Sequence, residues 1–265
     1  MIDKIITLGP KFSYSYNVAL VNYEKLDIEP VDTISAVFDN LSDTSHGIVP
    51  IENMINGSVR ETFLALQQNE VSIVNAFDYS IEHVLASQGD EFTTIMSHAQ
   101  ALVQCNEYVD EMRKQGISVI EASSTSKAME IASADASIAA IGSNDAANYY
   151  KLSVIEQNIS NKDKNVTRFI EISKKVKKTS GEKTSVIIKP TTDRSGLLFE
   201  ILSVFKIKNL NLTKIESIPT GEKMNDYIFY LDLDGCMEDE NMKDAFEFLN
   251  TFVDVTILGS YNIVR

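Results

Sequence analysis

Four stretches of the sequence carry polar residues that a folded core alone would not require. In the first, Ser13 and Ser15 follow an apolar run that ends at Leu8. Ligands of open α/β sheets collect at the carboxyl ends of strands, so these hydroxyls are well placed to bind one. Ser13 is equally suited to be the N-cap of a following helix. The segment therefore indicates either a ligand loop or a plain strand-to-helix turn.

The second stretch places Glu52 and Asn53 at the end of another apolar run, just before a turn at Gly57 that we expect to open a helix. Free amides at Gly57 and Ser58 would suit a carboxylate ligand. A simple turn capped by Ser58 explains both of those residues but leaves Glu52 and Asn53 unexplained. This pair is therefore a candidate for binding or catalysis.

The third stretch begins at Ser97, which can cap a helix. Gln100 and Gln104 then lie four residues apart, on one face of that helix. His98 stands beside them without a nearby Asp or Cys, so neither a metal site nor a catalytic triad is predicted here. The segment offers amide groups, not a nucleophile.

In the fourth stretch, Arg168 lies between Thr167 and Phe169 in an otherwise apolar run. Thr and Phe are typical of strands, so a plain strand is the simplest interpretation. An Arg buried in such a strand would need an anionic partner.

The elements that would position these residues alternate between strands and helices over residues 1–173. Such alternation predicts a largely parallel α/β sheet. The run 71–86 is longer, and we interpret it as a strand that crosses into a second lobe, with a return near residue 165. The predicted strands are 5–8, 47–51 and 139–141, and the predicted helices are 98–114 and 125–134.

The remaining chain predicts a linker and a second unit. Five lysines between residues 174 and 183 surround a Ser-Gly turn, which is typical of a solvated linker, although a basic run can also bind an anion. The order of the following elements is that of a βαββαβ ferredoxin-like unit. Its core is small, so we expect it to pair with a second copy. Its elements are strands at 184–189, 211–218, 226–233 and 255–258, and helices at 195–205 and 239–251.

In this order, the segments GPKFSYS, VPIENMINGSV, SHAQALVQC and NVTRF resemble prephenate dehydratase, and SGLL and NLTKIESIP resemble the ACT regulatory domain. The resemblance covers nearly the whole chain. It implies a two-lobed, periplasmic-binding-protein-like catalytic region of α/β class at 1–173, with lobes at about 1–75 plus 163–173 and at 76–162. A linker at 174–182 and an ACT domain at 183–265 would follow.

The resemblance also implies an activity and its residues. Prephenate would lose carbon dioxide and water to give phenylpyruvate, in phenylalanine biosynthesis. Because aromatisation drives the reaction, no metal or other cofactor is expected. Carried over by position, the catalytic residues are Thr167, Glu52, Asn53 and Gln104. The substrate-binding residues are Arg168, Phe169, Ser97, Ser13, Ser15, Gly57 and Thr125.

For regulation, the resemblance implies that L-phenylalanine binds where two ACT domains pair, in a homodimer or a tetramer. The residues expected near it are Gly196, Leu197, Leu198, Asn211, Leu212, Thr213, Glu216 and Ser217. The sequence departs from the family at three places. Phe12 replaces a loop glycine, Met54 replaces a serine, and Ile218 replaces an arginine. Phe disfavours positive φ, so the loop is expected to differ in shape, and Ile218 puts phenylalanine feedback in question.

Two alternatives share the same scaffold. Arogenate differs from prephenate only at the side-chain keto or amino group, so an arogenate dehydratase is the closest rival. A prephenate decarboxylase that does not aromatise is more distant, and the Thr167-Arg168-Phe169 segment favours dehydration. A non-catalytic amino-acid sensor would keep the fold for binding only. The intact Glu52, Asn53 and Thr167 argue against it.

Composition excludes several other classes. The 265 residues include 38 acidic and 24 basic ones, for a net charge of −14, which disfavours nucleic acid and anionic membranes. Two distant cysteines, no secretory leader and no apolar run of about 18 residues predict a cytoplasmic protein. Since prephenate is a dianion, its binding must rely on local positive groups, with Arg168 and helix N-termini as candidates.

Overall fold

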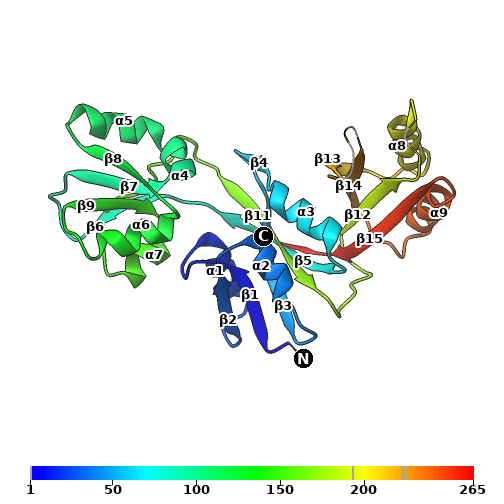
Figure 1. Ribbon diagram of the computed structural model, residues 1–265, viewed down its shortest axis with the longest axis horizontal. Coiled ribbons are helices and arrows are strands. Elements are labelled where there is room, and N and C mark those ends of the chain that lie inside the picture. The colour runs from blue at the N-terminus through cyan, green and yellow to red at the C-terminus, as the bar shows by residue number, and fades with distance from the viewer. Residues whose placement is uncertain (1, 193, 222–223, 225) are drawn as a thin grey trace.

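Three β-sheets follow one another along the long axis of the molecule (Figure 1). The computed structural model describes residues 2–192, 194–221, 224 and 226–265. We call the elements around the central, seven-stranded sheet the first lobe and those around the five-stranded sheet the second lobe. The four-stranded sheet and its two helices form the C-terminal unit.

The first lobe is built around the strand order β16-β5-β11-β3-β1-β2, with β4 on β3. β1, β2 and β3 are parallel, whereas β11 is antiparallel to both β3 and β5. The sheet is thus mixed, not largely parallel as predicted, because β5 leads the chain out to the second lobe and β11 brings it back. Its elements are β1 (Lys4–Leu8), α1 (Tyr14–Asn22), β2 (Asp27–Val31), α2 (Ile34–Asp39), β3 (Ser45–Asn53), β4 (Gly57–Ser58), α3 (Arg60–Gln68), β5 (Ser72–Ser80), β11 (Val166–Ser173) and β16 (Ile263–Val264).

The second lobe has the strand order β10-β6-β9-β7-β8 and is also mixed. The predicted helix 98–114 is two helices, because Cys105 leaves helical geometry with φ −117° and ψ 23°. Its elements are β6 (Val84–Ser87), β7 (Thr94–His98), α4 (Ala99–Gln104), α5 (Asn106–Lys114), β8 (Ser118–Ala122), α6 (Thr125–Ala132), β9 (Ile138–Gly142), α7 (Asn144–Tyr149) and β10 (Ser153–Glu156).

The C-terminal unit confirms the predicted βαββαβ order, with the antiparallel sheet β13-β14-β12-β15. Figure 1 shows both helices on the side of this sheet that faces away from the first lobe. One apolar core lies between helices and sheet, and includes Ile201, Phe205 and Phe246. The elements are β12 (Lys183–Pro190), α8 (Leu197–Ile207), β13 (Leu212–Pro219), β14 (Tyr227–Asp234), α9 (Glu240–Leu249) and β15 (Val253–Tyr261).

The other face of this sheet shares a core with the first lobe. Ile218, Tyr230 and Tyr261 belong to the same buried cluster as Phe63 and Ile170 of the first lobe. Directly after β15, the chain adds β16 to the first-lobe sheet, parallel to β5. The C-terminal unit is therefore packed against the first lobe and tied to it through the backbone.

The loop after β1 keeps positive φ in spite of its large side chain. Phe12 has a φ of 62°, so it keeps the left-handed backbone conformation that we expected a phenylalanine to avoid. Its ring stacks on Tyr149 of the second lobe, with 3.9 Å between ring centroids. We infer that this contact offsets part of the cost of the conformation, which for a bulky residue is about 1–3 kcal/mol.

Candidate active site

The end of β3 and the start of β11 hold four of the predicted site residues, and the sheet divides them between its two faces. Thr167 pairs with Asn53, and Arg168 pairs with Glu52, in the antiparallel register of the two strands. Because successive side chains on a strand point to opposite faces, each pair lies on its own face. The predicted set therefore forms two groups with different surroundings.

The first group is a buried network at the junction of the lobes. Asn53 Nδ2 lies 2.9 Å from Thr167 Oγ1 and 2.7 Å from Asn165 Oδ1. Asn165 Nδ2 in turn lies 3.1 Å from Oε1 of Gln104, at the end of α4. Three predicted catalytic residues, Thr167, Asn53 and Gln104, are thus brought together, with Asn165 as the link between the lobes.

Backbone amides fix the direction of every hydrogen bond in this network. The amides of Ile55 and Asn56 donate to Asn53 Oδ1, each at 3.0 Å, so the Asn53 Nδ2 group must be the donor to Thr167. The Thr167 oxygen accepts, and among the described residues its hydroxyl donates to no other group. The structure therefore leaves the Thr167 proton available to a ligand.

The network of hydrogen bonds continues from Gln104 to His83 and Tyr14. Gln104 Oε1 accepts from Asn165, so His83 Nε2, 2.8 Å away, must carry a proton and donate to it. Burial lowers the pKa of His83 and so favours the neutral ring. The hydrogen bond to Gln104 raises the pKa, but by less. The Nδ1 of His83 lies 3.0 Å from the Tyr14 hydroxyl, whose single proton is also directed at the Glu82 carbonyl oxygen, 2.8 Å away. The Gln104 oxygen thus accepts two hydrogen bonds, and none of the described residues accepts one from its amide nitrogen.

The second group faces the C-terminal unit. Arg168 donates to both carboxylate oxygens of Asp78, on β5, at 2.7 and 2.8 Å, and this contact raises the pKa of Arg168 in spite of its partial burial. Glu52 Oε1 lies 3.0 Å from Nζ of Lys214, on β13. Arg168 is consequently already paired with a carboxylate and is not an open receptor for a substrate anion.

The predicted helix start at Gly57 and Ser58 is wrong. Gly57 and Ser58 form β4, which pairs with the end of β3, and Val59 is the N-cap of α3. Gly57 has a φ of 78°, which a glycine adopts readily at this turn. The amides of Ile55 and Asn56 hold Asn53, and the Met54 amide donates to the Val166 carbonyl on β11, so the segment positions the network instead of capping a helix with Ser58.

Several predicted binding residues are committed to local contacts. The Ser13 hydroxyl caps α1 and donates to the Leu8 carbonyl at 2.8 Å. Ser97 lies within β7 and is not a helix cap. Its hydroxyl donates to the Ile141 carbonyl at 2.6 Å, and His98 is the N-cap of α4. Phe169 is buried in the apolar cluster beneath α1.

The two remaining hydroxyl residues lie in the first turns of helices from opposite lobes. Ser15 is buried in the first turn of α1, and Thr125 begins α6. These helix ends approach each other, because Ser126 donates to the Lys11 carbonyl at 2.7 Å. First-turn amides have no intrahelical acceptor, so both ends offer donors to an anion.

The residues predicted to bind an amino acid also fall into two places. Gly196, Leu197 and Leu198 line a cavity of about 210 Å³ with Tyr227 and Phe229. On β13, by contrast, Glu216 accepts a hydrogen bond from Ser58 of the first lobe at 2.7 Å. Within the C-terminal unit, Asn211 donates to Asp234, Thr213 accepts from Lys183, and Leu212 and Ser217 belong to β13.

Sequence reasoning missed Asn165, His83, Tyr14, Asp78 and Lys214. Asn165 stands in the NVTRF segment and Tyr14 stands between Ser13 and Ser15, so both were within reach of a motif argument. His83, Asp78 and Lys214 gave no signal, because their importance depends on strands that meet only in the fold. In the described part of the chain, no group of three His, Cys, Asp or Glu side chains could hold a metal ion.

The fold and this network define the class of the protein: a two-lobed α/β enzyme of periplasmic-binding-protein type, followed by a ferredoxin-like unit. A family model described as prephenate dehydratase matches residues 5–177, and one described as ACT domain matches residues 191–250. The chain belongs to the prephenate dehydratase family, and its C-terminal unit is an ACT domain.

Similar proteins and solved structures agree with this family assignment. A prephenate dehydratase of Methanocaldococcus jannaschii is 35% identical over 99% of both chains. A bifunctional chorismate mutase/prephenate dehydratase of Aquifex aeolicus is also 35% identical, over 97% of this chain and 73% of the relative. The structure of prephenate dehydratase in complex with L-Phe from Arthrobacter aurescens matches with a TM-score of 0.85 and 30% identity, covering 99% of this chain and 90% of that one.

Proposed function

We propose that this chain converts prephenate to phenylpyruvate with Thr167 as the hydrogen-bond donor to the departing hydroxyl. The observation that carries this role is the direction of the network. Asn53 donates to the Thr167 oxygen, which leaves the Thr167 proton free and makes the hydroxyl a better donor through cooperativity. The amide nitrogen of Gln104, which has no acceptor among the described residues, adds a second donor at the lobe junction.

The chemistry needs such donors and little else. The bond from the ring to the departing carboxylate breaks, its electron pair enters the ring, and the bond from C4 to its hydroxyl breaks. The dianion takes up one proton overall and yields phenylpyruvate, carbon dioxide and water. A threonine hydroxyl is a weak acid, so it stabilises the developing charge on the leaving oxygen while the net proton comes from solvent.

For the carboxylates, we propose the first turns of α1 and α6. The contact from Ser126 to Lys11 supports this, because it holds the two helix ends close together across the lobes. Tyr14 in the first turn of α1 also reaches the carbonyl of Glu82 at 2.8 Å, next to His83. The helix ends therefore lie on the side of the network that carries Thr167.

Ultraviolet detection of phenylpyruvate formed from prephenate tests the function directly. We expect turnover without added metal or cofactor, and no product at micromolar enzyme would refute the proposal and favour a sensor. Arogenate should be tested in parallel, since two relatives from Arabidopsis thaliana, 29% and 28% identical, are named arogenate dehydratase/prephenate dehydratase. A higher kcat/KM with arogenate would reassign the substrate.

We propose that L-phenylalanine regulates the enzyme through the cavity next to Gly196. Apolar side chains of Leu197, Leu198 and Phe229 suit its ring. Arg194 also lines the cavity, and because it is paired with Glu200, it would have to exchange that carboxylate for the carboxylate of the ligand. Ile218 does not oppose this, because its side chain is buried in the core shared with the first lobe. Calorimetry should detect binding of phenylalanine but not of alanine, and the absence of a heat signal would refute the proposal.

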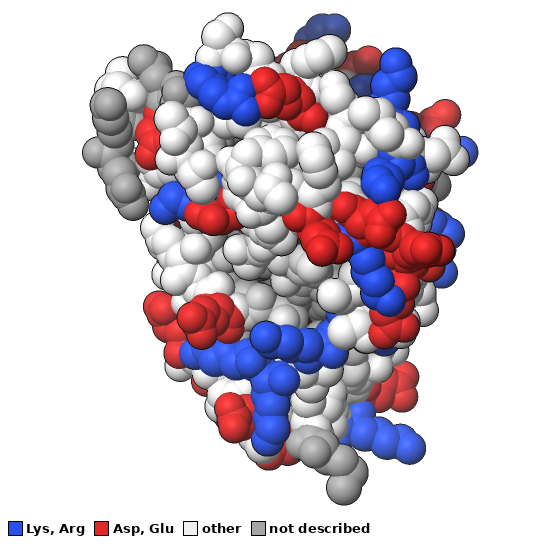
Figure 2. Space-filling model, turned by 90° about the vertical axis from the view of Figure 1, so that its right-hand side faces the viewer, with Lys and Arg blue, Asp and Glu red and all other residues white. Residues whose placement is uncertain are grey.

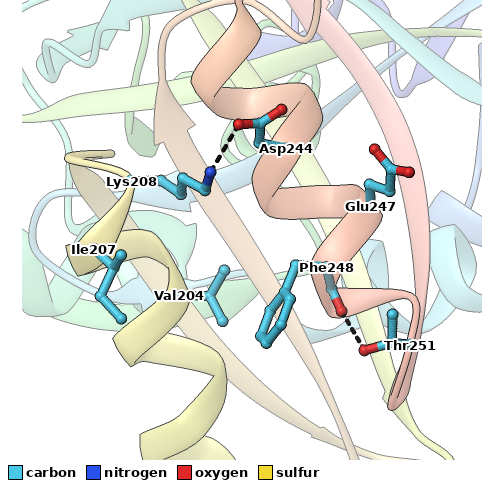
Figure 3. A pocket seen from close by; sticks show the side chains of 7 residues that line it. All are labelled: Val204, Ile207, Lys208, Asp244, Glu247, Phe248 and Thr251. Carbon is cyan, nitrogen blue, oxygen red and sulfur yellow. Dashed lines mark hydrogen bonds and ion pairs between the residues drawn. The ribbon is translucent and has the colours of Figure 1, made fainter.

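We also propose that the chain forms a homodimer or tetramer through its ACT domain, in the cytoplasm. The helices of this domain carry exposed apolar side chains, namely Phe199, Ile207 and Phe248, with exposed fractions of 76%, 79% and 56%. Figure 3 shows the groove between α8 and α9, in which Phe248 lies opposite Val204. No helix among the described residues is long and apolar enough to span a membrane.

A further inference from the structure

A short hairpin joins the ACT domain to the catalytic network. It consists of the end of β3 and of β4, in which Glu52 pairs with Ser58 and Asn53 pairs with Gly57. Asn53 points to one face of the sheet, toward Thr167. Glu52 points to the other face, toward β13 of the ACT domain. The hairpin is therefore placed to carry a displacement from one face to the other.

Lys214 of β13 holds both strands of this hairpin. Its Nζ lies 3.0 Å from Glu52 Oε1 and 3.0 Å from Ser58 Oγ. It also lies 5.6 Å from the ring centroid of Phe63, at cation–π distance. The Lys214 side chain is only 11% exposed, so these three groups replace most of its water.

Glu216, two residues along the same strand, completes the contact. Its carboxylate accepts the Ser58 hydroxyl proton at 2.7 Å. Ser58 thus accepts from Lys214 and donates to Glu216, which defines its orientation completely. Two side chains of one ACT strand consequently fix the position of the hairpin relative to the ACT sheet.

The hairpin in turn fixes Asn53. The amides of Ile55 and Asn56, in the hairpin turn, hold Asn53 Oδ1, and this aims the Asn53 amide at Thr167. A shift of the hairpin would therefore misdirect the hydrogen bond that leaves the Thr167 proton free. Errors of about 1 Å in such geometry can cost about 100-fold in rate.

We propose that Lys214 is a positioning residue for the dehydration: from the ACT domain it holds Glu52 and Ser58, and so keeps Asn53 aligned with Thr167. This inference rests on the proposed role of Thr167. It also assigns a route for regulation, because any amino acid that displaces β13 would move Lys214 and with it the hairpin.

The test compares kcat and KM for prephenate in Lys214→Met, Lys214→Arg and Lys4→Met. Lys4 is the control, since it forms an ion pair with Glu29 inside the first lobe, at 2.8 Å. We expect Lys214→Met to lower kcat by about 10- to 100-fold with little change in KM, and Lys214→Arg to restore most of the activity. Lys4→Met should behave as the wild type.

A double-variant cycle separates positioning from general destabilisation. If Lys214 acts through Glu52, the effects of Lys214→Met and Glu52→Gln on kcat will be less than additive. Full additivity, or a kcat for Lys214→Met within about twofold of the wild type, would overturn the inference. If Lys214→Met does not fold, Ser58→Ala replaces it under the same criteria.

Failure of this inference is distinguishable from failure of the proposed function. An active Thr167→Val variant would remove Thr167 from its role whatever Lys214 does. An inactive Thr167→Val variant beside a fully active Lys214→Met variant would refute the inference about Lys214 alone.

Discussion

At the scale of single residues, neighbours in the chain have separate tasks because a strand alternates its side chains. Asn53 and Thr167 belong to the polar network at the lobe junction, whereas Glu52 and Arg168 are paired with Lys214 and Asp78 on the opposite face. A shift of one residue would exchange these tasks. The identity of the site therefore depends on strand register as much as on residue type.

We predict that Thr167→Val lowers kcat by about 10²- to 10⁴-fold and changes KM little, because the donor to the leaving hydroxyl is lost. Thr167→Ser keeps that donor and serves as the matched variant, with most of the activity retained. Steady-state kinetics with prephenate checks both. Equal loss in the Ser and Val variants would show that packing of the methyl group, and not the hydroxyl, matters.

At the scale of elements, β11 carries the proposed catalytic hydroxyl of Thr167 at one end and a buried cluster around Glu171 at the other. Glu171 on β11 accepts from His46 Nδ1 at 2.5 Å, from the Tyr23 hydroxyl at 2.7 Å and from Asn75 Nδ2 at 2.6 Å. These partners come from β3, from the end of α1 and from β5. The cluster fastens three adjacent elements to the strand that positions Thr167.

This cluster predicts a dependence of stability on pH. Burial by itself raises the pKa of Glu171, but the hydrogen bonds from His46, Tyr23 and Asn75 outweigh it, so the folded-state pKa lies below the ordinary value of a glutamate. A depressed pKa contributes stability above the pKa of the unfolded chain, and this contribution is lost as the pH falls through the folded value. Glu171→Gln mimics the protonated carboxyl and should destabilise the fold by about 2 kcal/mol at pH 7.

Urea unfolding of the wild type and Glu171→Gln between pH 3 and 7 checks this, on the scale of about 1–3 kcal/mol expected for hydrogen bonds to a charged group. The difference between the two proteins should shrink as the pH decreases. A difference that is constant over the whole range would contradict the assignment to ionised Glu171.

A second prediction at this scale concerns the close approach of β15 to β5. Gly259 has a φ of 151°, and a Cβ on it would lie 2.3 Å from the Ile73 carbonyl oxygen. Gly259→Ala should destabilise the protein by about 1–3 kcal/mol or more, because the two strands would have to separate. Gly89→Ala, where a Cβ would meet nothing within 4 Å, is the control. Equal midpoints of thermal unfolding in the two variants would argue against this packing.

At the scale of the whole molecule, the net charge of −14 describes the surface and not the site. Figure 2 views the ACT end, where acidic and basic side chains surround an uncharged area. Mixed charge of this kind neither attracts nor strongly repels a second copy at physiological salt. The exposed apolar residues of α8 and α9 can therefore dominate association.

We predict that Ile207→Lys shifts the protein toward monomers in sedimentation velocity at micromolar concentration, because a charge would be buried at the proposed contact. Val103→Lys is the matched control: Val103 is 71% exposed but lies on α4, in the second lobe far from the ACT domain. An unchanged oligomeric state for Ile207→Lys, or equal dissociation of both variants, would exclude the outer surface of α8 as the contact.

The sequence by itself determined the elements and the family. Apolar periodicity located most strands and helices of the C-terminal unit to within a few residues, and the ordered motifs identified the chain, because both depend on residues close together in sequence. The motifs also singled out Thr167, Asn53 and Gln104, which the fold brings together. Local patterns carry this information because secondary structure and short motifs are formed by neighbours in the chain.

Only the tertiary structure decided which side chains share a face and what they contact. The pairing of β3 with β11 turned Arg168 toward Asp78 and Glu52 toward Lys214, and joined Gln104 to Asn53 through Asn165. The hydrophobic pattern of a strand restricts which of its residues face the core, but which distant strand lies beside it is settled only when the whole sheet packs. For that reason the mixed sheets and the link from Lys214 to the hairpin emerge only when the chain is folded.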